Sequence, residues 1–340
     1  MSKSRISNQL NKKLFKYNKT EKWMFNSILK SALTVTCCLT STFAMANYPE
    51  KPITLIVGFS AGGGTDVMAR NVVPYLEKYL GDDATVVVKN MPGASGQIGI
   101  TEVAHSDPDG YTIGTYNLPG MMARTLDREA KYSAESFTYL ANIVNDPNVI
   151  VTSKRSGIDD LQKFISDVKE SSRPLAIGMS SLGGDDHLGL IKFEGLTDTK
   201  FNIIPFKGSS AARTAVLGGH VKAAVLNISE VTEFKDELNI IGISDQERSE
   251  FDSSVATFKE QGVDMVNGSM RGFVAPEGLP EEVKNKLLVA FENLAKDPEF
   301  LAKMKSTANP VSVSIGEDFE SLNNETYKLA KDVWEKTPWK

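Results

Sequence analysis

The stretch ITLIVGFSAGGGTDVMAR at residues 53–70 runs an apolar strand through three consecutive glycines into the start of a helix. A helix start leaves its first backbone N–H groups unpaired, so such a junction can bind an anion. The same order of strand, small-residue loop and helix recurs along the chain as far as residue 244. Because strands that alternate with helices form parallel sheets, the sequence predicts an α/β fold with these loops at the sheet edges.

Apolar runs and turn residues predict the individual elements. Strands are expected at 53–59, 84–90, after the turn at 107–110, twice within 137–153, and at 174–179, 201–206, 221–227, 238–244 and 271–276. Helices are expected at 65–80, up to residue 105, and at 159–171, 187–195, 210–218, 229–237, 280–295, 297–305 and 317–335. Thr65 is predicted to be the N-cap of the first helix, and Pro74 is predicted to kink it.

The first 46 residues differ from the rest in charge. They contain eight Lys or Arg and one acidic residue, and an apolar run within 27–46 ends in Ala44-Met45-Ala46. This order is typical of a secretory signal peptide, and we predict cleavage after Ala46. Met24 is an alternative start of the chain. The apolar run is too short and too rich in Ser and Thr to span a membrane.

The remaining chain, from residue 47, is acidic. It holds 30 basic and 42 acidic residues, a formal charge of −12. A nucleic-acid partner would need a basic surface, so this composition argues against one. The two cysteines, Cys37 and Cys38, both lie in the leader. The exported chain is therefore expected to have no disulfide and no thiol chemistry.

Several predicted strands end in loops of glycine, serine and other small polar residues. In α/β sheets, ligands bind beyond the carboxyl ends of the strands. Hydroxyls and helix-start N–H groups from two domains could therefore face each other across a cleft and converge on a small anion. These loops are Ser60–Asp66, Asn117–Gly120, Ser180–Asp186, Lys207–Ser210 and Asn227–Ser229.

Longer motifs carry a family resemblance. The segment YPEKPITLIVGFSAGGGTD resembles the mature start of the periplasmic substrate-binding proteins of tripartite tricarboxylate transporters, the Bug proteins. The segments VKNMPGASGQIGITEVAHSDPDGYTIG, GGDDHLG, FKGSSAARTAVLGGHV and MRGFVAPEGLPEEV follow with the order and spacing of that family. The resemblance covers residues 48–335 and rests on several motifs together.

The resemblance implies a fold and a function. The fold would be the two-domain periplasmic-binding-protein fold of type II, a Venus flytrap with two crossover strands at the hinge. Domain 1 would comprise 47–145 plus 245–340, domain 2 would comprise 146–244, and 1–46 would be the signal peptide. The protein would be a periplasmic monomer that captures a small organic acid, a di- or tricarboxylate, and delivers it to membrane permease subunits. No catalysis, cofactor or metal is expected.

Family resemblance and loop chemistry select the same candidate ligand-binding residues. In the family, backbone amides, hydroxyls and ordered waters hold the ligand carboxylates, rather than an arginine clamp. Asp66 could contribute its backbone N–H to the ligand or only favour the helix start. The candidates are Ser60, Ala61, Gly63, Gly64, Thr65, Asp66, Asn117, Ser180, Ser181, Gly184, Asp185, His187, Ser209 and Asn227.

Asp185 departs from the family pattern, and Arg271 stands at a position that is often aromatic or Arg in the family. Many members have Ser or Thr near the position of Asp185. An acid in the cleft would repel a ligand carboxylate, at a cost of about 4 kcal/mol for two charges 4 Å apart at an effective dielectric near 20. Asp185 could point away, could cap the helix 187–195, or could face a ligand that also carries an amine or a protonated group. Arg271 could form a hinge salt bridge or contact the ligand.

Other chemistries find little support in the sequence. Gly62–Gly64 do not continue into a dinucleotide-binding pattern, because Val67 stands where the third glycine belongs. No zinc motif is present, and the adjacent acids Asp185 and Asp186 are a weak signal for calcium. His187 could be a structural hydrogen-bonding residue or a ligand contact.

Two alternative functions remain open at this point. A secreted α/β hydrolase could use His187 and Asp185, although the chain has no G-x-S-x-G nucleophile motif. A ligand sensor would close on its ligand in the same way and then dock on the outer domain of a membrane sensor. The sequence does not separate sensing from delivery, nor does it name the organic acid.

Overall fold

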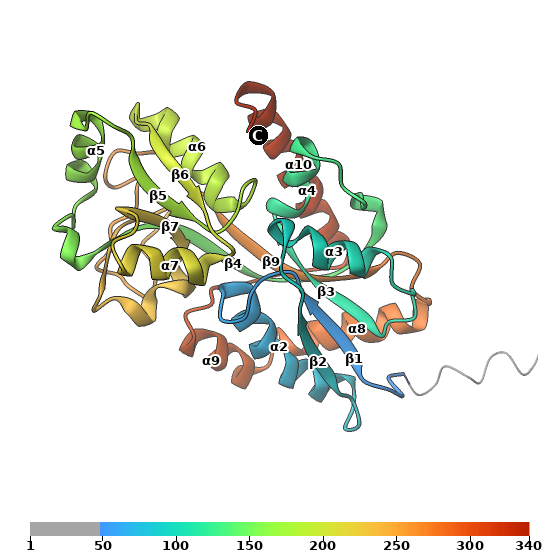
Figure 1. The fold of residues 1–340 in the computed structure, drawn as a ribbon. Helices are drawn as coiled ribbons and strands as arrows, with labels where there is room; N and C mark the ends of the chain where they lie inside the picture. Colours follow the sequence, from blue (N-terminus) through green and yellow to red (C-terminus); the bar gives the residue numbers. More distant parts are fainter. Residues whose placement is uncertain (1–47, 340) are drawn as a thin grey trace, which may run out of the picture. The chain divides into compact units, whose positions relative to one another are not determined.

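The structure is a computed structural model, and it describes residues 48–339. The predicted signal peptide, its cleavage site and both cysteines lie outside the described residues. The chain divides after Tyr48, and the fold below is that of the unit Pro49–Lys340. It consists of strands that alternate with helices, as the sequence predicts (Figure 1).

The first lobe is built on strands from both ends of the chain. β1 lies between β2 and β3 and is parallel to both, while β9 and β10 are antiparallel to their neighbours. Helix α2 packs against α8 and α9. The elements of this lobe are β1 (Ile53–Val57), α2 (Gly64–Leu80), β2 (Val86–Asn90), α3 (Gln97–Ala104), β3 (Thr112–Leu118), α4 (Gly120–Asp127), β9 (Gly268–Pro276), α8 (Glu281–Leu294), α9 (Pro298–Ser306), β10 (Val311–Ile315) and α10 (Glu317–Lys336).

The second lobe is built on a second parallel group. β5 lies between β6 and β7 and is parallel to both. Short 3₁₀ turns, η4 (Ile228–Glu230) and η5 (Thr232–Phe234), follow β7. The other elements of this lobe are α5 (Leu161–Glu170), β5 (Leu175–Met179), α6 (Asp185–Thr197), β6 (Phe201–Pro205), α7 (Ser209–Leu217), β7 (Ala223–Asn227) and β8 (Leu238–Ile243).

One long strand, β4 (Phe137–Ser153), belongs to both lobes. Its residues 137–147 pair with β9, and its residues 148–152 pair with β7. The sequence analysis predicted two strands here, which is wrong. The backbone stays extended through Pro147, whose missing N–H falls where the strand changes partners from β9 to β7.

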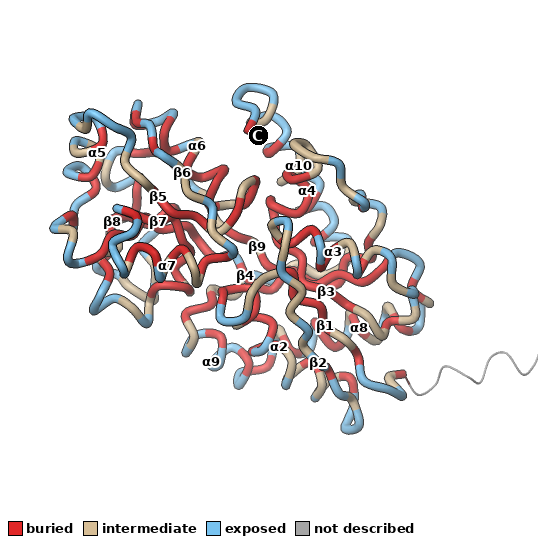
Figure 2. Tube along the Cα trace, viewed as in Figure 1, coloured by how far each residue is buried: buried red, intermediate tan, exposed pale blue. Residues whose placement is uncertain are grey.

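Each lobe has its own apolar core. In the second lobe Phe164, Phe193 and Phe258 are buried together, and in the first lobe Tyr116 and Phe319 are buried. Burying one such aromatic side chain contributes about 1.5–3 kcal/mol. Figure 2 shows the buried residues following the strands, while the exposed residues lie on the outer helices and loops.

A small third cluster joins the lobes. It consists of Ala123 of α4, Leu188 of α6, and Ala330 and Trp339 at the C-terminal end of the chain. The ring of Trp339 meets that of Trp334 edge to face, with 4.7 Å between the ring centres. The lobes are therefore held together by apolar contact as well as by β4.

Two local predictions need correction. Thr65 is not the N-cap of α2: Gly63 is, and the Thr65 hydroxyl accepts from Asn117. The expected helix 229–237 is the pair of 3₁₀ turns η4 and η5. Helix α2 continues through Pro74 to Leu80, and the kink at Pro74 stays a prediction. The sequence analysis also missed β10 and the helix α4, which carries a residue of the site.

No helix among residues 48–339 combines the length and apolar character needed to cross a membrane. The predicted domain boundaries at 145/146 and 244/245 stay predictions. The first of these falls inside β4, close to the point where that strand changes its pairing partner.

Candidate functional site

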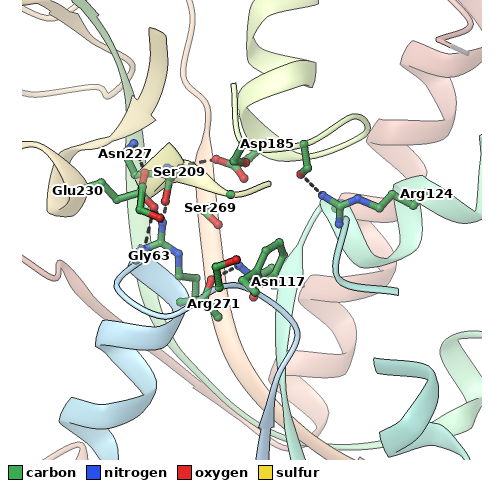
Figure 3. Close-up of a pocket in the computed structure, with 18 residues that line it drawn as sticks. Gly63, Asn117, Arg124, Asp185, Ser209, Asn227, Glu230, Ser269 and Arg271 are labelled. Carbon is green, nitrogen blue, oxygen red and sulfur yellow. Dashed lines mark hydrogen bonds and ion pairs between the residues drawn. The ribbon is translucent and has the colours of Figure 1, made fainter. Parts of the chain in front are cut away.

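One pocket is lined by both lobes. Its walls are the segments that follow β1, β3, β5, β6 and β7, together with β9 (Figure 3). Its cavity volume is about 30 Å³, so the loops of the two lobes approach each other closely there. The lining consists of Phe59, Ser60, Gly63, Gly64, Thr65, Asn117, Gly120, Arg124, Ser180, Ser181, Asp185, Gly208, Ser209, Ser210, Asn227, Glu230, Ser269 and Arg271.

The glycine loop after β1 is held in shape by Asp66. The carboxylate of Asp66 accepts from the backbone N–H of Gly62 at 2.9 Å and from Arg70 and Asn90. Gly62 adopts a φ of +76°, which favours glycine. Burial raises the pKa of Asp66, but the hydrogen bonds outweigh burial and lower it overall. The side chain of Asp66 therefore stabilises the loop and does not line the pocket.

The N-terminus of α2 is occupied by a carboxylate of the protein itself. Glu230 of η4 accepts from the backbone N–H of Gly64 at 3.2 Å through Oε1. Its Oε2 accepts from the backbone N–H of Asn227 at 3.0 Å. The sequence analysis expected the backbone N–H of Gly64 to bind a ligand anion, but this N–H donates to Glu230 instead. The position nevertheless has the anion preference that the glycine junction predicted.

Arg271 connects this carboxylate to a second buried acid. Its Nη2 donates to Glu230 Oε1 at 3.2 Å, and its Nη1 donates to Asp146 Oδ2 at 2.5 Å. Burial raises the pKa of Asp146 to about 6, against the opposing charge of Arg271. Of the two roles considered for Arg271, the salt bridge is confirmed. Its charge is matched by two carboxylates, although its side chain also reaches the pocket lining.

Arg124 of α4 also lines the pocket, but no carboxylate among residues 48–339 forms an ion pair with it. Its Nη2 donates to the Ser181 hydroxyl at 2.7 Å and its Nε to the Leu182 carbonyl at 3.1 Å, both in the second lobe. Figure 3 shows the side chain extending toward the lobe that carries Asp185. A Cβ on Gly120 would lie 2.6 Å from Arg124 Nη1, so the guanidinium packs directly on the start of its own helix. Burial lowers the pKa of Arg124.

Asp185 faces the pocket. Its Oδ2 accepts from Asn148 at 2.8 Å and from Asn227 at 3.1 Å. The expectations that Asp185 points away or caps its helix are therefore wrong. The neighbouring Asp186 closes the loop instead, because its carboxylate accepts from the backbone N–H groups of Ser180 and His187. Burial and the charge of Asp185 raise the pKa of Asp186 to about 7.

His187 has a structural hydrogen bond. Its Nδ1 accepts from the backbone N–H of Gly183 at 3.1 Å, and its ring meets Trp339 edge to face. Burial lowers the pKa of His187 to about 4, so the ring is neutral at pH 7. Of the two alternatives for His187, the geometry supports the structural role and not the ligand contact.

Loops of the two lobes also meet on the other side of the pocket. The Ser60 hydroxyl donates to the Lys207 carbonyl at 3.3 Å. The Ser209 hydroxyl lies 3.3 Å from the position that a Cβ on Gly63 would take. These contacts bring hydroxyls and the starts of α2 and α7 to the same pocket.

Ten of the fourteen candidates line the pocket, and for all fourteen ligand contact stays a prediction. The four that do not line it are Ala61, Asp66, Gly184 and His187. The sequence analysis did not select Phe59, Gly120, Arg124, Gly208, Ser210, Glu230 or Ser269. Gly120, Gly208 and Ser210 lie in loops that it named, and Asn-x-x-Glu at Asn227–Glu230 is a capping-box pattern that could have revealed Glu230. An arginine clamp was not expected, yet two arginines reach the lining.

Among the described residues, no group of three His, Cys, Asp or Glu side chains is placed to hold a metal ion. The pocket offers instead backbone amides, hydroxyls, amides of Asn and two guanidinium groups. Such a set can bind and orient a small polar molecule. It contains no nucleophile that is paired with a base.

Comparison with known proteins identifies this architecture. The chain matches the model of the tripartite tricarboxylate transporter family receptor, TctC, over residues 68–337. BugT of Bordetella pertussis is 33% identical over 242 residues, which cover 69% of this chain and 74% of BugT.

Two solved structures share the fold closely. One, described as a periplasmic transporter, has 30% identity and a TM-score of 0.80 and covers 85% of this chain and 98% of its own. The other is Rpa4515 of R. palustris with adipate, which has 25% identity, a TM-score of 0.80 and the same coverage of 85% and 98%.

Two lobes around a shared pocket, joined by β4, are the two-domain periplasmic-binding-protein fold that the resemblance implied. This chain belongs to the tripartite tricarboxylate transporter receptor family, to which the Bug proteins also belong. Members of that family are periplasmic solute-binding proteins, and they are not enzymes.

Proposed function

We propose that this protein captures a small organic acid of the di- or tricarboxylate class and delivers it to the membrane permease of a tripartite uptake system. The ligand would bind between the lobes, and binding would favour the closed arrangement over an open one. The solved relative with adipate supports this ligand class.

The observation that carries the proposal is the buried guanidinium of Arg124 in the pocket, on which the charges of Asp185 and Asp186 act only from beyond ion-pair distance. Arg124 is 2% exposed, and among residues 48–339 it has no carboxylate partner within ion-pair distance. A buried guanidinium is stabilised by a bidentate carboxylate, which an organic acid supplies. The starts of α2, α4 and α7 border the same pocket and favour an anion.

Binding without turnover fits the geometry better than hydrolysis. The hydrolase alternative needed His187 as a base, but its Nδ1 accepts from Gly183 and its ring lies outside the pocket lining. We therefore expect a bound acid to be recovered chemically unchanged. No observation in the structure favours the sensor over the transport component.

A thermal-shift and calorimetric screen at pH 7.5 tests the proposal. The purified protein is mixed with citrate, C4–C6 dicarboxylates, aromatic acids and acidic amino acids. A ligand that binds only the native state stabilises it by about 2.7 kcal/mol at a hundredfold excess over Kd. The proposal expects at least one acid to bind with micromolar or better affinity. If the folded protein binds none of them, the proposed function is wrong.

Location and partners have their own tests. N-terminal sequencing of the exported protein should begin at Asn47 if the leader is cleaved after Ala46. Light scattering should give the mass of a monomer. Loss of acid uptake in cells that lack this protein, restored by its return, would support delivery to a permease. Unchanged uptake together with a lost transcriptional response would favour sensing.

A further inference from the structure

The pocket contains an unpaired buried donor. Among residues 48–339, Arg124 Nη1 has no hydrogen-bond partner, although Nη2 donates to Ser181 and Nε donates to the Leu182 carbonyl. Buried polar atoms in native proteins are rarely left unpaired, and a charged one least of all. The Nη1 atom lies against Gly120, the first residue of α4, where the helix dipole also favours an anion. This end of the pocket therefore favours an anionic group.

The pocket also contains a negative charge that a plain dicarboxylate does not match. Asp185 lines it, and the hydrogen bonds from Asn148 and Asn227 both go to Oδ2. Among residues 48–339, no Lys, Arg or His forms an ion pair with Asp185. The Asp185 carboxylate therefore keeps acceptor capacity at the pocket, although the charges of Arg124 and Arg271 act on it without a direct ion pair. An anionic group placed beside it would be repelled.

A second acceptor in the lining is unpaired as well. Asn117 is 8% exposed, and its Nδ2 donates to Thr65 Oγ1 at 2.8 Å. Its Oδ1 has no partner in the described part of the chain. A dicarboxylate at neutral pH carries only acceptors, so it would satisfy Arg124 and leave Asn117 and Asp185 unmatched. A ligand that combines a carboxylate with a positively charged donor matches all three groups.

We propose that the preferred ligand is a zwitterionic amino acid, whose carboxylate pairs with Arg124 and whose ammonium group pairs with Asp185. This inference rests on the proposed function and narrows the ligand class of the same site. Arg271 does not compete for the carboxylate, because Asp146 and Glu230 already match its charge. Asp185 then discriminates amines from plain acids, and Asn117 offers a further acceptor to the ammonium group.

Matched ligand pairs test this with the wild-type protein. Calorimetry at pH 7.5 compares succinate with aspartate, glutarate with glutamate, and adipate with 2-aminoadipate, which differ only in the amine. The expected result is at least tenfold tighter binding of the amino member in one pair or more. Equal or tighter binding of the plain dicarboxylates overturns this inference and leaves the proposed function standing. Binding of neither kind by the folded protein overturns both.

Single amino acids with one carboxylate form a further arm. Binding of alanine or serine would support the zwitterion and would overturn the di- and tricarboxylate class. Absence of their binding, with aspartate or glutamate bound, would keep both proposals.

The variant Asp185→Asn tests the assigned contact. It should weaken binding of the amino ligand at least tenfold and leave the matched dicarboxylate unchanged or bound more tightly. The control is Asp159→Asn, which removes the same charge from an exposed position of the second lobe and should change neither ligand. If Asp185→Asn weakens both ligands of a pair equally, Asp185 is only structural and the inference fails.

The variant Arg124→Lys keeps the charge but loses the two-pronged geometry. It should weaken both members of a pair about equally, by about tenfold, because both use the carboxylate. Thermal melts without ligand confirm that each variant folds. Unchanged affinity in folded Arg124→Lys would contradict the carboxylate assignment.

Discussion

Glu230 Oε1 accepts a hydrogen bond from the backbone N–H of Gly64 at 3.2 Å, and the two residues belong to different lobes. The contact places a carboxylate of the second lobe at the start of α2 in the first. An external anion would favour the same position. Glu230 therefore occupies the position that the helix start offers to an anion, and its contact joins the two lobes at the pocket.

The variant Glu230→Gln removes the charge of this side chain but nearly keeps its shape, so it tests the effect of the charge alone. Gln retains an acceptor for Gly64 but removes one of the two charges that match Arg271. We expect a loss of about 1–3 kcal/mol in the free energy of unfolding and tighter binding of an acid, because the pocket becomes more positive. Urea denaturation and calorimetry measure the two effects.

The matched control for this variant is Glu233→Gln, which removes the same charge from an exposed position in η5. It should change stability by less than about 0.5 kcal/mol and leave affinity unchanged. Weaker acid binding by folded Glu230→Gln, with normal binding by the control, would show that Glu230 supports the ligand site instead of competing with the ligand.

Adding one methyl group at Gly64 should break the same contact sterically. A Cβ there would lie 2.6 Å from Glu230 Oε1 and 2.7 Å from Arg271 Nη1. Gly64→Ala is therefore expected to cost about 1–3 kcal/mol through overpacking. Gly195→Ala, in α6, meets nothing within 4 Å and should stabilise the protein by about 0.5–1 kcal/mol. Equal changes in melting temperature for Gly64→Ala and Gly195→Ala would show that a Cβ at position 64 does not clash with Glu230 and Arg271.

The Arg271 cluster predicts a large cost for losing its cation. Arg271→Met leaves Asp146 and Glu230 buried without a positive partner. Removing one partner of a buried ion pair typically costs about 3–5 kcal/mol. The loss should be smaller at pH 5 than at pH 8, because Asp146, whose pKa is already raised to about 6, can take up a proton.

Arg248→Met is the control for this experiment. Arg248 pairs with Glu260, but its side chain is 43% exposed compared with 2% for Arg271. Exposed ion pairs contribute about 0–1 kcal/mol, so this variant should stay within that range at both pH values. Comparable losses in the two variants by urea denaturation would contradict the buried network as the source of stability.

The sequence predicts the loops of the site because their signals are local. Glycines after an apolar strand indicate the start of a helix. Because strands and helices alternate, several such helix starts lie together at the carboxyl ends of the strands. Gly63, Ser181 and Ser209 reach the lining as this logic expects. The alternation also gives the fold class, since β1 and β5 each lie between two parallel neighbours.

The side chains that set the charge of the pocket were harder to predict. Arg124 lies on α4, whose sequence GMMARTLD follows a Pro and opens with a Gly, both signals for a loop. The orientation of Asp185 depends on two asparagines, Asn148 and Asn227, that meet only because β4 pairs with β7. Such contacts depend on tertiary packing, which periodicity and spacing do not report.

His187 predicts a specific acid sensitivity. Its pKa is lowered to about 4 by burial, below the value near 6.5 of the unfolded chain. The unfolded state therefore binds the proton first, and the stability that neutral His187 contributes is present above pH 6.5 and is lost as the pH falls to 4. The full loss is about 3 kcal/mol, from about 1.36 kcal/mol per pH unit.

The variant His187→Asn removes the titrating ring. The Oδ1 of the new Asn can accept the hydrogen bond that the Gly183 N–H donates to His187 Nδ1 in the wild type. The stability difference between wild type and variant should shrink by up to about 3 kcal/mol from pH 6.5 to pH 4. Asp146 and Asp186, whose raised pKa values favour the folded state in acid, are present in both proteins, so their contribution cancels in the difference. The control His220→Asn replaces a histidine at an exposed position and should change the free energy of unfolding by less than about 0.5 kcal/mol at pH 6.5. A pH-independent difference for His187→Asn, measured by urea denaturation, would mean that the buried ring titrates normally.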